Sequence, residues 1–317
     1  MINLKKEKIL VTGANGFLGK HLISRLKDKN IEFYPSSSKK FDLTNSSDVY
    51  RLFNKVKPTI VFSLAAKVGG ILANKKFKAD FYKINSLINT YTFEMCKKFK
   101  VKKLINVGAG CGYPLSLKEP LREEEIWNGF PQSESAPYSL SKKMILIQSI
   151  AYKEQYGLNS ITLIPSNLYG EYDNFNLEES HVIPALVCKF YEAKNFGKTL
   201  NVWGNSKVSR DFIHASDVAN GLIIAAQKYN KSLPLNICSG KQSSIKEIVF
   251  YLKKITNFKG KIIWDKKKPT GQKSRKMSQL NQKKYLNKWL PKIKIYQGLN
   301  ITYDWFKENY DNKNLRL

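Results

Sequence analysis

Short apolar runs alternate with longer amphipathic stretches through the first half of the chain. The runs that have the length and β-branched content of buried strands are residues 8–12, 31–34, 59–64, 104–107 and 160–164. Residues 80–99 and 139–156 instead carry apolar side chains at intervals of three and four, which is typical of helices. Strands that alternate with helices predict a parallel sheet with helices on both faces.

We therefore predict an α/β fold, a Rossmann-type doubly wound parallel sheet with a smaller α/β substrate-binding lobe. The alternation loosens in the second half of the chain, where residues 235–237 look like a strand that returns to the sheet. The predicted dinucleotide-binding domain comprises residues 1–169 and 214–240, and the predicted lobe comprises residues 170–213 and 241–317.

Charge is the unusual feature of the composition. Lysine and arginine number 54 against 25 acidic residues, which gives a net charge of +29 over 317 residues. The excess is mostly lysine and is spread along the chain, whereas direct reading of bases depends largely on arginine. The pattern favours a polyanionic small ligand over nucleic acid.

Several classes of protein are disfavoured by the sequence. It contains no apolar run long enough for a membrane-spanning helix. The N-terminus leads straight into a strand-like segment without a signal peptide, and the four cysteines include no CxxC pair. We expect a cytoplasmic protein with reduced thiols and without a metal site.

Residues 11–19 read Val-Thr-Gly-Ala-Asn-Gly-Phe-Leu-Gly, between the first strand and the first helix. Gly13 permits a tight turn, Gly16 lets the backbone approach a pyrophosphate, and Gly19 lets the helix pack on the strand. The N-terminus of that helix supplies N–H donors to the phosphates. The motif in this context predicts a dinucleotide site.

The end of the second strand distinguishes the two nicotinamide dinucleotides. An acid there would bind the ribose hydroxyl of NAD, but residues 35–40 read Pro-Ser-Ser-Ser-Lys-Lys. Hydroxyl and ammonium groups such as those of Ser37 and Lys39 suit the 2′-phosphate of NADP, so we expect NADPH/NADP as cofactor. Asp42 and Leu43 are placed to face the adenine. The alternative is that all of these are ordinary loop residues.

Tyr138 and Lys142 are four residues apart, which places them on one face of a helix. A nearby ammonium lowers the pKa of a phenol, and the phenol can then pass a proton to a developing alkoxide. The pair follows the glycine-rich turn at the distance found in short-chain dehydrogenase/reductases.

With these motifs the chain resembles the GDP-L-fucose synthases. These extended short-chain reductases convert GDP-4-keto-6-deoxymannose by 3,5-epimerisation and NADPH-dependent 4-reduction. The blocks that carry the resemblance span nearly the whole chain and are residues 11–19, 64–71, 108–114, 138–142, 165–170, 173–175, 180–186, 202–204, 210–214, 268–271 and 275–276. Generic short-chain reductases lack the block at 180–186.

The resemblance implies roles for four catalytic residues. Tyr138 is the proton donor to the sugar 4-oxygen, and Lys142 lowers its pKa and holds the nicotinamide ribose. Cys111 is the base of the epimerisation and His181 its acid. A thiolate on one face and an imidazolium on the other can invert a carbon next to a ketone. The alternatives are a buried apolar Cys111 and a structural His181.

The resemblance also implies two sets of binding residues. The positions matching cofactor contacts are Gly13, Asn15, Gly16, Phe17, Leu18, Gly19, Leu64, Ala65, Ala66, Asn85, Tyr138, Lys142, Pro165, Asn167, Leu168 and His181. The positions matching the sugar-nucleotide side are Asn167, Lys189, Trp203, Arg210, Lys273 and Arg275. Basic groups there would neutralise the diphosphate, and Trp203 would stack on the nucleotide or else pack in the core. A homodimer through the helices at 80–99 and 142–156 is a further implication.

One position departs from the family. The usual Ser hydrogen-bonded to the reacting oxygen is Ala109 here, and losing such a donor typically costs about 2–4 kcal/mol in the transition state. Its neighbour Gly110 offers no hydroxyl. Gly112 replaces a bulky apolar residue, which predicts a wider or looser turn. The enzyme is then a slower fucose synthase, a reductase of a larger sugar such as a heptose, or one that has lost a partial reaction.

We expect a 4-reductase of a GDP-4-keto sugar, with 3,5-epimerisation left open. The alternative is a dedicated C4 reductase of a GDP-4-keto-heptose in surface-polysaccharide biosynthesis, such as capsule or lipopolysaccharide. A 4,6-dehydratase would want Asp-Glu at positions 110–111, and a 4-epimerase would want an acid after the second strand. A catalytically silent NADP-binding or nucleic-acid-binding protein would show no NADPH turnover with a keto-sugar nucleotide.

Overall fold

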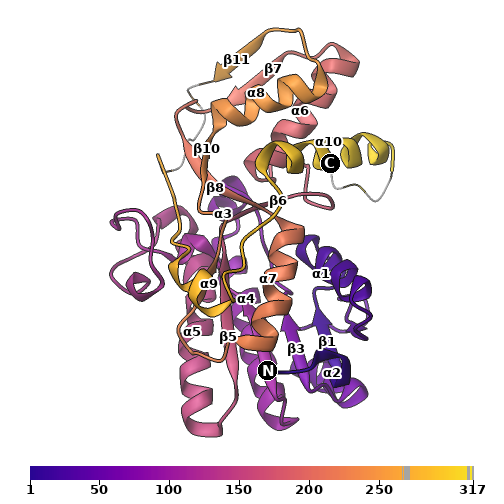
Figure 1. The fold of residues 1–317 in the computed structure, drawn as a ribbon, viewed down its shortest axis with the longest axis vertical. Helices are drawn as coiled ribbons and strands as arrows, with labels where there is room; N and C mark the ends of the chain where they lie inside the picture. Colours follow the sequence, from indigo (N-terminus) through magenta and orange to yellow (C-terminus); the bar gives the residue numbers. More distant parts are fainter. Residues whose placement is uncertain (266, 268–271, 313–314, 316–317) are drawn as a thin grey trace.

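The computed structural model describes residues 1–265, 267, 272–312 and 315, and a six-stranded parallel sheet lies at the centre of one domain (Figure 1). Its strands, in spatial order, are β2 (Tyr34–Pro35), β1 (Ile9–Thr12), β3 (Ile60–Ser63), β4 (Lys103–Val107), β5 (Ser160–Pro165) and β9 (Leu235–Ile237). The order reverses beside β1, as in a doubly wound sheet. The predicted Rossmann-type α/β class is confirmed, although the second strand is shorter than the predicted 31–34.

Helices cover both faces of this sheet because alternate strand residues point in opposite directions. In β1, Ile9 and Val11 join a core formed with α1 (Phe17–Asp28) and α7 (Ala215–Lys228). Leu10, between them, faces a second core formed with the helices α2 (Ser46–Val56), α4 (Lys78–Lys98) and α5 (Ala136–Tyr156). Strands buried on both faces need continuous apolar runs, as the sequence shows.

The smaller lobe has its own core, in which Phe190, Leu252 and Phe306 are fully buried. It is built from α6 (Val182–Phe196), α8 (Ile245–Thr256), α10 (Ile295–Asn309), β7 (Leu200–Trp203) and β11 (Ile262–Asp265). A three-stranded sheet of β6 (Asn167–Tyr169), β8 (Ser209–His214) and β10 (Gln242–Ser244) connects it to the main sheet. Figure 1 shows the lobe at one end of the parallel sheet.

The remaining helices are short: η1 (Leu4–Lys6), α3 (Ile71–Lys76), η2 (Gly110–Gly112), η3 (Glu123–Glu125), η4 (Ser133–Ser135) and α9 (Leu280–Tyr285). Around α9 the structure differs from the predicted lobe of 241–317. Leu286 and Trp289 pack against the nucleotide-domain core, and Met277 packs beside Tyr113 and Cys238. This segment has too short a helix to show a clear apolar period.

Candidate active site

The glycine-rich turn has the close packing that a dinucleotide site needs. Gly13 has a φ of +66°, and a Cβ there would lie 2.7 Å from the Ala65 nitrogen. A Cβ at Gly19 would lie 2.1 Å from the Gly13 oxygen. Gly16 is the N-cap of α1 and has no side chain to cap it, which leaves the N–H groups of the first turn to an anion. The turn therefore fits a bound pyrophosphate.

The adjoining wall is the loop after β3. The Thr12 hydroxyl accepts hydrogen bonds from the backbone N–H groups of Leu64 (3.2 Å) and Ala65 (3.4 Å). The Asn85 amide accepts from the Lys67 N–H and donates to the Lys67 carbonyl, each at 3.0 Å. Asn85 therefore holds the loop by hydrogen bonds to the backbone of Lys67. Ala66 lies between Ala65, which is bound by Thr12, and Lys67.

The residues expected at the adenosine end lie around the end of β2. Ser37 is half-buried and its hydroxyl accepts the N–H of Lys39 at 3.3 Å, while the Lys39 side chain is exposed. The Asp42 carboxylate is engaged within its own turn, where it accepts the N–H and the hydroxyl of Thr44 at 2.8 Å each. Leu43 is buried in the core beside α2.

The predicted catalytic pair lies in the first turns of α5. The Lys142 ammonium donates to the Val107 carbonyl at 3.1 Å, and burial lowers the pKa of Lys142 to about 8. The Tyr138 ring meets Phe81 edge-on, with centroids 6.0 Å apart. Burial, and then the charge of Cys111, raise the pKa of Tyr138, in contrast to the lowering expected from Lys142. The phenol of Tyr138 is therefore protonated at neutral pH and is able to donate that proton.

Cys111 lies in η2, which is in contact with α5, and is half-buried. Burial raises the pKa of its thiol, while a hydrogen bond from Ser139 and the charges of Arg275 and Lys142 oppose that rise. The Arg275 guanidinium donates to the Gly110 carbonyl at 2.7 Å and to the Tyr113 carbonyl at 3.4 Å. Arg275, expected on the diphosphate, thus also holds the turn that carries the thiol.

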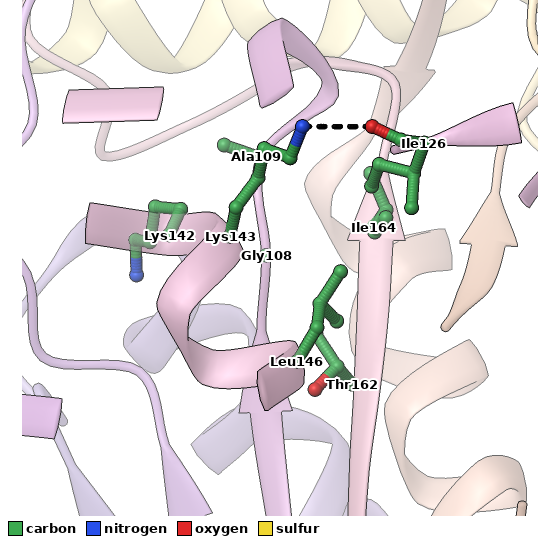
Figure 2. Close-up of a pocket in the computed structure, with 8 residues that line it drawn as sticks. All are labelled: Gly108, Ala109, Ile126, Lys142, Lys143, Leu146, Thr162 and Ile164. Atoms are coloured by element: carbon green, nitrogen blue, oxygen red, sulfur yellow. Dashed lines mark hydrogen bonds between the residues drawn. The ribbon is translucent and has the colours of Figure 1, made fainter. Parts of the chain in front are cut away.

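The space beside Gly112 is filled by a residue that sequence reasoning missed. A Cβ at Gly112 would lie 3.3 Å from Cγ of Lys143, whose stem is buried. Figure 2 shows Lys143 extending to the Ile126 carbonyl, which accepts from its ammonium at 2.8 Å. The turn is packed rather than loosened, contrary to the prediction. The only sequence signal was the second of two adjacent lysines on an otherwise apolar helix face.

A small cavity of about 10 Å³ lies between Ala109, Lys143 and Thr162 (Figure 2). Within the described ranges, the buried Thr162 hydroxyl has no hydrogen-bond partner. The volume is close to that needed for one water molecule. The cavity is thus suited to a single bound water behind the catalytic turn.

His181 is the N-cap residue of α6 and lies on the opposite lobe. The segment before it is tied to the loop after β3, because Gly70 donates its N–H to the Glu179 carbonyl at 2.7 Å. The residue is exposed, yet the protein around its ring disfavours the charged form and lowers the pKa of His181.

The predicted sugar-nucleotide residues fall into two groups. Arg210, Lys273 and Arg275 lie together, because the segment carrying the last two runs beside β8 through a bond from Ser209 N–H to the Lys273 carbonyl (3.0 Å). Burial, and then the charge of Arg275, lower the pKa of Arg210 to about 10. Two repelling guanidinium groups suit an anionic ligand.

The second group is a cation–aromatic pair. The Lys189 ammonium lies 4.4 Å from the centroid of the Trp203 ring and donates to the Asn201 carbonyl at 2.9 Å.

Of the other positions expected at the cofactor, Asn167 is exposed at the start of β6, Pro165 ends β5, and Leu168 is half-buried. The block at 268–271 lies outside the described residues.

Two further features of the described residues concern membranes and metal ions. No helix among the described residues is long and apolar enough to cross a membrane. The same part of the chain contains no cluster of three or more His, Cys, Asp or Glu residues that could hold a metal ion.

The chain is similar to several known proteins. Residues 9–238 match the NAD dependent epimerase/dehydratase family. A putative GDP-L-fucose synthase 2 from Arabidopsis thaliana is 36% identical, with 98% of this chain and 94% of the relative covered. The GDP-L-fucose synthase of Escherichia coli (strain K12) is 30% identical, with 97% and 99% covered.

Two solved structures are also closely similar. A GDP-L-fucose synthetase from Naegleria fowleri bound to NADP has a TM-score of 0.92 at 29% identity, covering 100% of this chain and 98% of that one. A GDP-mannoheptose C4 reductase from Campylobacter jejuni with NADP bound has a TM-score of 0.87 at 31% identity, covering 97% and 100%. Both similarities extend over the two lobes.

Proposed function

The chain belongs to the NAD dependent epimerase/dehydratase family, and we propose that it is an NADPH-dependent 4-reductase of a GDP-4-keto sugar, related to the GDP-L-fucose synthases. The observation that supports this most directly is that Cys111 of η2 lies close enough to Tyr138 and Lys142 of α5 to affect the ionisation of both. The glycine-rich turn between β1 and α1 lies in the same domain.

In the reduction, the glycine-rich turn before α1 would hold NADPH, which would supply the hydride for C4 of the sugar. Tyr138 enters with its proton in place and donates it to the C4 oxygen as charge develops there. Lys142 is charged at neutral pH, is fixed by the Val107 carbonyl, and stabilises the phenolate that Tyr138 becomes. Ala109 offers no donor to the same oxygen, so the proton transfer depends on Tyr138.

For the epimerisation, Cys111 removes the proton next to the ketone and His181 returns one from the other face. The Cys111 thiol must ionise first, and burial opposes this. Arg275 and Lys142 both favour the thiolate, and Arg275 also holds the turn. These contacts support retention of the 3,5-epimerase step.

A second candidate is a dedicated C4 reductase of a GDP-4-keto-heptose that does not epimerise. Ala109 favours it, because its methyl group leaves more room near the reacting carbon than a hydrogen-bonded serine would. The similarity to the GDP-mannoheptose C4 reductase described above favours it too. Either activity would serve surface-polysaccharide biosynthesis, such as capsule or lipopolysaccharide, in the cytoplasm.

A homodimer through α4 and α5 is part of the proposal. Met144, Ile147 and Ile150 are spaced by three along α5 and are 44%, 46% and 38% exposed, with Tyr82 of α4 46% exposed. An apolar stripe at that spacing lies on one helix face and suits a second copy of the chain. Sedimentation velocity of Ile147→Glu should show monomers where the native chain shows dimers. Nucleic acid is not proposed as a partner.

The test is NADPH oxidation, followed by absorbance, with GDP-4-keto-6-deoxymannose and with a GDP-4-keto-heptose. NMR in deuterated water follows exchange at C3 and C5. Oxidation with the hexose and exchange at both carbons support the fucose-synthase reaction, whereas oxidation with the heptose alone and no exchange support the second candidate. Tyr138→Phe should lose oxidation with either sugar. Absence of oxidation with both sugars in the native enzyme refutes the proposal.

A further inference from the structure

Lys273 and Arg275 lie on a segment that runs beside β8. Ser209 N–H donates to the Lys273 carbonyl at 3.0 Å. Asp211 N–H donates to the Arg275 carbonyl at 3.3 Å, so Arg210 of β8 lies beside the same segment. Like charges repel, and this arrangement therefore needs a further contact to hold it when no anion is bound.

Glu119 makes a side-chain contact to this segment from the loop between η2 and η3. Its Oε2 accepts hydrogen bonds from the Ser274 hydroxyl at 2.8 Å and from the Gln242 amide at 3.1 Å. The Gln242 amide also donates to the Ser274 hydroxyl at 2.6 Å. Ser274 is the residue between Lys273 and Arg275, and Gln242 begins β10. One carboxylate therefore joins the loop, the segment and a strand of the three-stranded sheet.

A cavity of about 260 Å³ adjoins these contacts. The residues that line it include Glu119, Lys273, Ser274 and Arg275, together with the apolar Leu117. The space suits part of a ligand that combines anionic oxygens with an apolar ring. Burial lowers the pKa of Arg275, and negative charges that include Glu119 oppose this. A carboxylate on the wall of an anion site repels the anion, which favours a role for Glu119 other than direct contact with it.

We propose that Glu119 is a positioning residue for the diphosphate-binding cations, and that its hydrogen bonds to Ser274 and Gln242 fix the segment that carries Lys273 and Arg275. This rests on the proposed function, because it takes a nucleoside diphosphate as the ligand of these cations. The carboxylate helps binding as a hydrogen-bond acceptor and opposes binding through its charge. Substitution separates the two effects, because glutamine keeps an acceptor oxygen without the charge and alanine keeps neither.

The experiment measures GDP binding by isothermal titration calorimetry, with NADP present at saturation so that GDP cannot occupy the dinucleotide site. Glu119→Ala should raise the Kd of GDP about fivefold, because the segment loses its side-chain hydrogen bonds. Glu119→Gln should bind GDP at least as tightly as the native chain. Ser274→Ala should raise the Kd by a similar factor, and the double variant with Glu119→Ala should be no weaker than either single variant, because both remove the same bond.

Glu124→Ala is the matched control. Glu124 is exposed like Glu119 and its removal changes the net charge equally, but it accepts only from the Asn281 amide, at 2.9 Å. This variant should bind GDP like the native chain, and NADPH affinity should be unchanged in every variant.

Three results would each overturn the proposal: an unchanged or lowered Kd in Glu119→Ala, an equal rise in Glu124→Ala, or no rescue by Glu119→Gln. GDP binding needs no turnover, so the outcome is independent of the reductase assay. Conversely, a chain that reduces a GDP-4-keto sugar while Glu119→Ala binds GDP normally refutes this proposal alone. Where the native enzyme turns over, Glu119→Ala should raise KM and leave kcat nearly unchanged.

Discussion

Replacing His21 by Gln tests a buried cluster that joins the two lobes. His21 of α1 lies against Glu171, which follows β6, and its Nε2 donates to the Glu171 carbonyl at 3.0 Å. His214, at the end of β8, brings its own Nε2 to 3.0 Å from the Glu171 carboxylate. Its Nδ1 accepts the Ser216 N–H at 3.3 Å, which places the ring proton on Nε2. Arg25 is the other charged group near His21.

Burial lowers the pKa of His21 from 6.5 to about 4, despite the opposing attraction of Glu171. Below pH 6.5 the His21 imidazole binds a proton in the unfolded chain, whereas in the folded chain it does so only below about pH 4. The free energy of unfolding therefore falls as the pH falls through this window. Each pH unit below 6.5 lowers the free energy of unfolding by about 1.4 kcal/mol, which gives a loss of about 2 kcal/mol near pH 5. Glu171 does not titrate in this window. Burial acts to raise the pKa of its carboxyl, but its hydrogen bonds and the charges of His214 and His21 lower that pKa to about 2.

The assay is urea unfolding followed by tryptophan fluorescence, at about pH 7.5 and about pH 5, for the native chain and for His21→Gln. The variant retains a donor to the Glu171 carbonyl but cannot titrate. It should be less stable than the native chain at the higher pH and should lose about 2 kcal/mol less on acidification. If the two proteins lose the same stability, His21 does not titrate as burial implies and the reasoning is refuted.

Four further predictions concern the site. Gly19→Ala should abolish NADPH binding in a fluorescence titration, because its Cβ would lie 2.1 Å from the Gly13 oxygen. Gly157→Ala is the control: its Cβ meets nothing within 4 Å, and the strain of alanine at its φ of +70° is confined to the end of α5, so it should bind normally. The rate of reduction should fall as pH rises through about 8, where Lys142 loses its charge, and a flat profile there would count against that role. Ala109→Ser should raise kcat by about 100-fold if the missing donor limits the reaction, and an unchanged kcat would show that Tyr138 suffices. Thr162→Val should destabilise the chain by about 1 kcal/mol in urea unfolding, because it removes a hydrogen-bond partner of the water that the cavity suits, and a gain of stability would indicate that no water is bound there.

Much of the fold follows from local patterns in the sequence. The strand at residues 8–12, the glycine turn after it and the helix with Tyr138 and Lys142 were all predictable, because each depends on neighbours within a turn or two. The helix ends were less so: α4 begins at Lys78 and α5 at Ala136, slightly before the predicted starts. Capping and packing decide such ends rather than apolar period.

The sequence by itself determined the fold class and the glycine-rich turn, since these depend on residue type and short spacing, and it supplied the reacting groups that we propose. Tertiary structure alone decided their environment. Arg275 reaches Gly110 from 165 positions away, and Lys143 fills the space that Gly112 leaves. The pKa of Tyr138 is raised by burial and then by the charge of Cys111, and burial is a property of the whole packed chain.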